Sequence, residues 1–144
     1  MLGLEQLAEL LEKYPAAAGK PVREFELDGR PFPFNSGPSI MGVVNLSPDS
    51  WYRESDCLST AAAVERGRVL HAQGAALVDV GAESTLAQAA RADQTLQTGK
   101  LLPVIKGLRD AGVLVSIETY LPAVSRAGLE AGASVLNLTG VTHL

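Results

Sequence analysis

The sequence is poor in cysteine and in aromatic residues: Cys57 stands alone, and aromatic residues make up 5% of 144 positions. A single cysteine cannot form an intrachain disulfide, and it excludes a metal site built from several cysteines. The longest apolar runs are far shorter than the roughly 18 residues that a transmembrane helix needs. The N-terminus interleaves charges with leucines, unlike a signal peptide. The sequence therefore predicts a soluble, cytoplasmic protein with no membrane partner.

Positive charge is also scarce, with 12 Lys and Arg against 16 Asp and Glu and a net charge of −4. Because contacts to nucleic-acid phosphates need clustered Lys and Arg, this balance argues against a nucleic-acid partner. Apolar mass is plentiful, since 47% of the residues are hydrophobic and 19% are charged. This composition excludes an intrinsically disordered chain and predicts a packed core.

The first 39 residues predict a helix followed by a hairpin. Four leucines between residues 4 and 14 form one apolar stripe on a helix, which Pro15 ends. The segment Val22–Phe34 carries apolar residues around the turn dipeptide Asp28-Gly29, a pattern typical of a short β-hairpin. We therefore assign residues 1–39 to an N-terminal helix and hairpin.

Residues 40–144 alternate strand-like and helix-like segments, which predicts an α/β fold with right-handed crossovers and a parallel sheet. The first strand is apolar throughout, which favours a sheet covered on both faces. A (β/α)₈ barrel takes about 250 residues, so this region forms either an open four-stranded sheet or the first half of a barrel. The predicted strands cover 40–44, 76–80, 113–117 and 134–138, and the predicted helices cover 60–73, 101–110 and 121–130, ending near Gly74, Gly112 and Gly132.

Polar side chains stand at the end of every predicted strand. Asn45 follows the first strand, Glu83 follows the second, Glu118 follows the third, and Asn137 lies near the end of the fourth. Because the carboxyl ends of parallel strands meet at one edge of a sheet, this pattern predicts a polar small-molecule site. The alternative for each residue alone is that it caps a turn or a helix.

These residues also carry a family resemblance. The stretches IMGVVNLSPDSWY (40–52) and GAALVDVGAEST (74–85) resemble motifs of the dihydropteroate synthases, and LLPVIKGL, VLVSIETY and AGASVLNLTG follow in the family's order. The resemblance spans residues 38–140 and implies a (β/α)₈ TIM barrel of the pterin-binding superfamily, to which this chain supplies about four βα units. It implies a transferase of folate biosynthesis that joins p-aminobenzoate to 6-hydroxymethyl-7,8-dihydropterin pyrophosphate with the help of Mg²⁺.

The resemblance assigns roles to residues near the first two strands. It implies that Asn45 binds Mg²⁺, whose preference for oxygen ligands suits an amide carbonyl. It places Asp49 and Ser50 in a loop that helps cover the pyrophosphate and aminobenzoate sites, and Thr85 near both groups. Glu83 is expected to hold its loop by hydrogen bonds. The alternatives are a turn role for Asn45, loop capping for Asp49 and a helix cap for Thr85.

The third and fourth strands supply the implied pterin contacts, together with departures from the family pattern. Asn137 matches an Asn that hydrogen-bonds the pterin ring, although a buried structural amide is the alternative. Glu118 stands where the family has a pterin-contacting Asp, which moves the carboxylate by about one methylene. Leu86 replaces an Arg and Leu138 replaces an Asp. The family's second half, with further anion-binding positions, is not among these 144 residues.

The sequence leaves the activity open among several functions. The first is a divergent dihydropteroate synthase, in which the chain alone has little or no synthase activity. The second is a pterin- or folate-binding paralogue or partner subunit without that activity, and the third is a pterin-dependent methyltransferase-type domain. Because the first and fourth strands would have unpaired edges, we also expect a homo-oligomer or association with a partner half.

Overall fold

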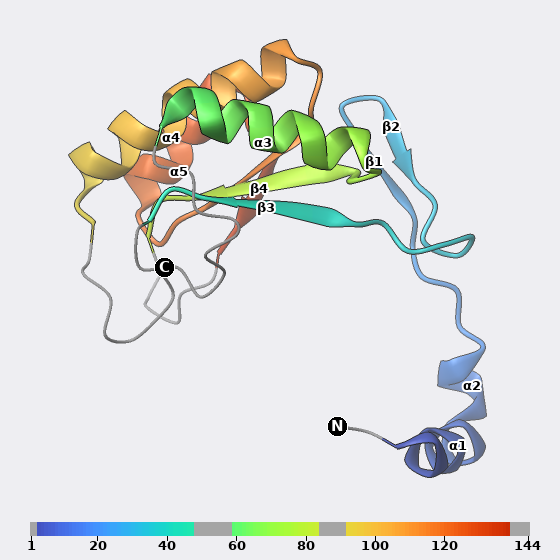
Figure 1. Cartoon of the computed structure of the whole chain (residues 1–144). Coiled ribbons are helices and arrows are strands. Elements are labelled where there is room, and N and C mark those ends of the chain that lie inside the picture. The colour runs from blue at the N-terminus through green and yellow to red at the C-terminus, as the bar shows by residue number, and fades with distance from the viewer. Residues whose placement is uncertain (1–2, 48–58, 84–91, 139–144) are drawn as a thin grey trace. The chain divides into compact units, whose positions relative to one another are not determined.

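A computed structural model of the chain describes residues 3–47, 59–83 and 92–138 (Figure 1). The chain divides into two compact units, Met1–Pro38 and Ser39–Leu144. Within the described residues, every helix is too short or too polar to span a lipid bilayer.

The first unit contains the predicted helix and hairpin. Pro15 is the first residue of a second short helix, where its missing N–H costs nothing. Asp28 and Gly29 form the hairpin turn with φ values of 48° and 75°, as the turn dipeptide predicted. The elements are α1 (Leu4–Lys13), α2 (Pro15–Ala18), β1 (Phe25–Leu27) and β2 (Arg30–Phe32), with β1 and β2 antiparallel.

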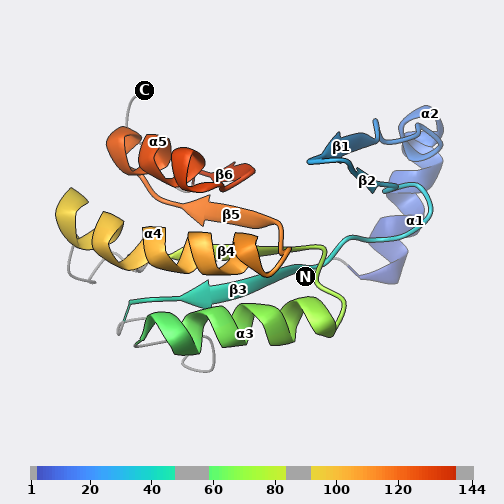
Figure 2. The same ribbon diagram turned by 90° about the horizontal axis from the view of Figure 1, so that it is seen from above.

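The second unit is a four-stranded parallel sheet in the order β3-β4-β5-β6. Its three helices lie on one face of the sheet (Figures 1 and 2). Strands in sequential order with helices on one face follow the winding of a (β/α) barrel, whereas a doubly wound sheet places helices on both faces. The elements are β3 (Met41–Asn45), α3 (Thr60–Ala72), β4 (Leu77–Gly81), α4 (Gln94–Asp110), β5 (Val115–Glu118), α5 (Pro122–Ala131) and β6 (Val135–Asn137).

The core lies between the sheet and these helices. Alternate residues of each strand point to the helix side, and fully buried Val44, Val80 and Ile117 belong to the same hydrophobic cluster as Leu101 and Leu108 of α4. The opposite face differs from the sequence expectation of a sheet covered on both sides. Met41 and Val43 remain 44% and 42% exposed, so the described residues cover β3 on its helix side only.

Two glycines let α3 and α4 pack closely. A Cβ added at Gly107 would lie 2.7 Å from Cγ2 of Val64, and one added at Gly67 would overlap Leu108. Each helix therefore contributes one glycine that receives a branched side chain of the other helix. Neither glycine leaves room for a methyl group without movement of its partner.

Helix α4 begins earlier than the sequence pattern predicted. It starts at Gln94, seven residues before the predicted start at Leu101, because the Asp93 carboxylate caps it by accepting a hydrogen bond from the Leu96 N–H at 2.8 Å. The predicted glycine positions at helix ends are confirmed: Gly74, Gly112 and Gly132 have φ values of 105°, 75° and 110°.

Candidate functional site

Three of the four strands bring a polar side chain to one level at their carboxyl ends, and β4 brings a glycine to the same level. Asn45 is paired with Gly81, Gly81 with Glu118, and Glu118 with Asn137. Residues paired across parallel strands project to the same face of a sheet. We call Asn45, Gly81, Glu118 and Asn137 the terminal row; it brings together three side chains that the sequence singled out.

Gly81 leaves a gap in the terminal row, and the Glu118 side chain extends into it. A Cβ added at Gly81 would lie 2.8 Å from Oε2 of Glu118 and 3.5 Å from its Cβ. The carboxylate therefore lies over the end of β4, the neighbouring strand. This position places an acidic oxygen near the middle of the row, where it is able to accept hydrogen bonds from a ligand.

Asn137 is held from below by a buried carboxylate on another strand. Its Nδ2 donates a hydrogen bond to Oδ2 of Asp79 at 3.0 Å, across 58 positions of sequence. Asp79 is only 3% exposed. It lies two residues before Gly81 on β4 and is paired with Ser116, whose small side chain stands between Asp79 and β6. In the sequence, Asp79 lies inside a predicted strand and carries no predicted role, although a carboxylate within an apolar strand is a signal of one.

The layer of Asp79 and Ser116 contains two polar atoms with unmet hydrogen-bonding capacity. Oδ1 of Asp79 and Oγ of Ser116 are buried and have no hydrogen-bond partner among the described residues. Burying such atoms is costly unless something else satisfies them. These two atoms can gain hydrogen bonds only from groups outside the described residues.

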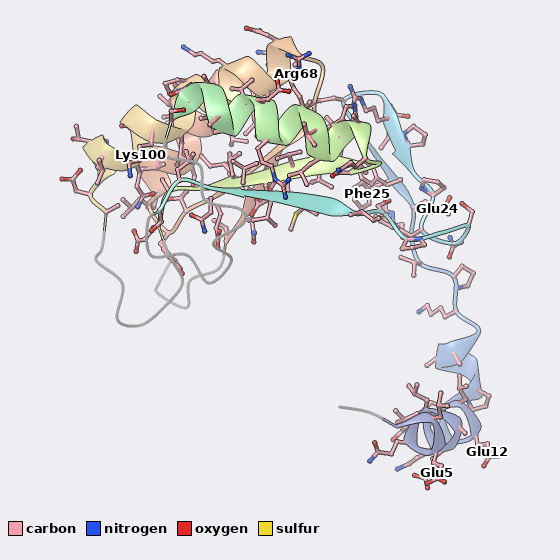
Figure 3. All side chains as sticks on the ribbon, viewed as in Figure 1. Glu5, Glu12, Glu24, Phe25, Arg68 and Lys100 are labelled. Atoms are coloured by element: carbon pink, nitrogen blue, oxygen red, sulfur yellow. The ribbon has the colours of Figure 1, made fainter. Side chains whose placement is uncertain are left out.

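Asn45 lies in a turn at the end of β3. Its Oδ1 accepts a hydrogen bond from the Ser47 N–H at 2.9 Å, which is the turn role that the sequence left as an alternative. Lys100 of α4 adds a cation at this end of the strand, since its Nζ donates to the Leu46 carbonyl at 3.1 Å (Figure 3). The sequence pattern does not single out Lys100, because nothing in the local pattern of α4 relates it to β3.

A buried network of polar side chains supports the ends of β4 and β5. The Gln97 side chain, which is fully buried, donates to Oε2 of Glu83 at 2.8 Å and to the Ala92 carbonyl at 2.9 Å. Its Oε1 accepts a hydrogen bond from Oγ1 of Thr119 at 2.7 Å. Glu83 thus accepts a hydrogen bond from α4, whereas the loop that it was expected to hold lies outside the described residues, and Gln97 connects Glu83 to the residue next to Glu118.

Other predicted site residues lie outside the described residues: Asp49, Ser50 and Thr85. Within the described ranges, no group of three or more His, Cys, Asp or Glu side chains is arranged to hold a metal ion.

Comparisons with known proteins identify the family to which the chain is similar. A family profile described as pterin binding enzyme matches residues 41–142. The dihydropteroate synthase of Mycobacterium leprae is 39% identical over 98 residues, which cover 68% of this chain and 34% of that protein.

The chain is also similar in structure to solved dihydropteroate synthases. The dihydropteroate synthase of Xanthomonas albilineans with 4-aminobenzoic acid matches 80% of this chain and 43% of its own, with a TM-score of 0.68 and 32% identity. That of Burkholderia cenocepacia complexed with 7,8-dihydropteroate matches 78% of this chain and 36% of its own, with a TM-score of 0.65 and 31% identity. The chain thus spans less than half the length of these relatives. With its parallel sheet wound as part of a TIM barrel, the chain belongs to the pterin-binding enzyme family.

Proposed function

We propose that the chain works in folate biosynthesis as a dihydropteroate synthase-like transferase, and that its terminal row binds 6-hydroxymethyl-7,8-dihydropterin pyrophosphate. The observation that carries this proposal is the register that sets Asn45, Glu118 and Asn137 at one level of the sheet. The similarity to dihydropteroate synthases supports it.

The chemistry of the row suits a pterin. The pyrimidinone edge of a pterin offers N–H donors beside acceptor atoms, so it matches a carboxylate that accepts and an amide that both donates and accepts. In the proposed reaction, the amine nitrogen of p-aminobenzoate attacks the methylene carbon next to the pterin ring. A C–N bond forms, the C–O bond to pyrophosphate breaks with its electrons leaving on oxygen, and the amine loses a proton.

Mg²⁺ fits the donor set at the end of β3 as part of this proposal. The carbonyl oxygen of Asn45 has two lone pairs, and the Ser47 N–H uses one of them. Mg²⁺ is commonly held by one or two protein ligands together with phosphate oxygens and water, so one amide oxygen is a sufficient protein contribution. When bound, the ion would neutralise charge that develops on the departing pyrophosphate.

Binding is tested by calorimetry on the chain with 6-hydroxymethylpterin, alone and together with pyrophosphate and Mg²⁺. Glu118→Gln removes the accepting charge, and the loss of a charge-assisted hydrogen bond of about 1.5–3 kcal/mol should weaken binding by roughly 10- to 100-fold. The matched control is Glu130→Gln, on the exposed surface of α5, which should leave binding unchanged. Absence of binding to the unmodified chain, or equal effects of the two variants, would contradict the proposal.

A second candidate function is pterin binding without synthase activity. It is favoured by the Glu118 side chain, which is longer than the family's Asp and reaches over Gly81, and by Leu86 in place of the family's Arg. A pyrophosphate-release assay with p-aminobenzoate and the pterin pyrophosphate separates the two candidates. We expect little or no turnover from the chain alone; ordinary turnover would establish the synthase and exclude the binding-only function.

A further inference from the structure

The hydrogen bond between Asp79 and Asn137 fixes which way the Asn137 side-chain amide faces. A carboxylate has only acceptor atoms, so the amide group that faces Asp79 must be the nitrogen of Asn137, which donates at 3.0 Å. The amide oxygen must then face away from Asp79. Without such a partner, an Asn side chain is able to rotate by half a turn and exchange its donor and acceptor.

We propose that Asp79 is a positioning residue that locks the Asn137 amide with its carbonyl oxygen toward the ligand, so that the terminal row selects a heterocycle carrying an N–H donor at that point. This inference rests on the proposed pterin site and adds to it the residue that sets the direction of its hydrogen bonding. The ligand class is a 2-aminopyrimidinone, whose exocyclic amine is a donor where a 2-oxo analogue has an acceptor.

The surroundings of Asp79 suit this role. The side chain is 3% exposed, so water competes little for the hydrogen bond, and a hydrogen bond to a buried charged group is stronger than one between neutral groups. Ser116 is paired with both Asp79 and Val135, and its small side chain occupies the strand that separates the carboxylate from β6. A larger residue at position 116 would obstruct the contact.

A merely structural role for Asp79 makes a different prediction from a positioning role. If the carboxylate only stabilises the fold, its loss weakens binding of every ligand in the same proportion. If it orients the amide, its loss changes the ratio between ligands that differ in donor and acceptor pattern. The ratio is therefore the decisive measurement.

The experiment compares two probes on the full chain, 6-hydroxymethylpterin and 6-hydroxymethyllumazine, in which a 2-oxo group replaces the 2-amino group. We expect the unmodified chain to prefer the pterin by at least about 10-fold, the value of one directed hydrogen bond. In Asp79→Asn, two amides face each other and pair in either orientation, so the preference should fall to within about threefold. Asp110→Asn, at the exposed end of α4, is the matched control and should keep the full preference.

The double variant in which the two residues are exchanged, Asp79→Asn with Asn137→Asp, distinguishes a loss of ligand preference from a failure to fold. Here the amide nitrogen introduced at position 79 donates to the carboxylate introduced at position 137, whose second oxygen faces the ligand as a fixed acceptor. The pterin preference should return together with the folding stability. A folded Asp79→Asn chain with an unchanged ratio, or a folded exchanged pair with no preference, would overturn the proposal.

Failure of the pterin site itself is recognised separately. If the unmodified chain binds neither probe, the proposed function fails, and the orientation is then read from the Asn137 side-chain amide protons by NMR. Slow exchange of one Nδ2 proton in the unmodified chain, lost in Asp79→Asn, would uphold the lock. Fast exchange in both chains would overturn it.

Discussion

The carboxylate of Glu118 on β5 occupies the space that Gly81 leaves open at the end of β4. A Cβ at Gly81 would approach Oε2 to 2.8 Å, whereas the Cβ of Glu118 would remain at an ordinary 3.5 Å. Only the far end of a flexible side chain would have to move. The glycine at position 81 therefore determines where the Glu118 carboxylate lies, and it has little effect on whether the sheet forms.

Gly81→Ala should weaken pterin binding while leaving the folding stability nearly unchanged. We expect binding of 6-hydroxymethylpterin to weaken by roughly tenfold, because displacing one charged hydrogen-bond partner costs about 1.5 kcal/mol or more. The free energy of unfolding should change by less than about 1 kcal/mol. The control is Gly99→Ala on α4, where no atom lies within 4 Å of the added Cβ. Calorimetry and urea unfolding measure both quantities, and an equal loss of affinity in the control would refute the relationship.

The two residues should also be coupled. In a Glu118→Asp background the carboxylate is withdrawn by one methylene from the position next to Gly81, so the added methyl group should cost little affinity. A double-mutant cycle on pterin binding should therefore give a coupling energy of about 1 kcal/mol or more. Additive effects, within about 0.5 kcal/mol, would show that Gly81 acts on binding independently of Glu118.

Gln97→Leu should destabilise the chain by about 2–3 kcal/mol, because buried Glu83 and Thr119 each lose a hydrogen-bond partner to an apolar group of similar size. Denaturant unfolding monitored by circular dichroism measures the loss. Gln94→Leu, at the exposed first turn of the same helix, should stay within about 0.5 kcal/mol of the unmodified chain. Similar stability in both variants would mean that the network contributes nothing measurable.

The contact between α3 and α4 should resist enlargement. Gly67→Ala forces a methyl group against Leu108, and overpacking of this kind costs about 1–3 kcal/mol. Gly99→Ala on the exposed side of α4 should instead stabilise the helix by about 0.5–1 kcal/mol, since alanine is the better helix former. Thermal unfolding of the two variants should shift the midpoint in opposite directions, and a shift in the same direction would contradict the packing.

We expect the chain to associate, either with itself or with a partner half. On the uncovered face, Met41 and Val43 expose apolar surface, and within the described residues β3 and β6 are each paired on one side only. Val43→Lys should lower self-association in sedimentation runs, because a charge on that face opposes burial. Leu129→Lys, on the exposed surface of α5, is the control. A strictly monomeric chain at high concentration would argue against self-association.

The alternation of strands and helices was readable from the sequence because buried strands and glycine-terminated helices leave local signals. The first turns of α4 were not, since the segment from Gln94 to Lys100 has no apolar stripe and its start depends on one capping carboxylate, Asp93. The exposed face of β3 was also missed, because an apolar strand looks the same whether one or both of its faces are covered.

The site was predictable in part for the same reason. Strand ends can be located along the chain, so Asn45, Glu118 and Asn137 were found. The pairing of Asp79 with Asn137 depends on contacts across 58 positions and two strand crossings, and Gln97 contacts Glu83 and Thr119 only after α4 has packed on the sheet. Such contacts arise from tertiary packing and have no local sequence signature.

The four residues of the terminal row lie at one level of the sheet. The site therefore depends on the length of each strand as much as on the identity of the residue at its end. A one-residue insertion or deletion within any of the four strands would turn that strand's contribution toward the helices, even with every motif letter retained. Alignments of such sequences should therefore tolerate gaps in the connecting segments and hardly any inside the strands.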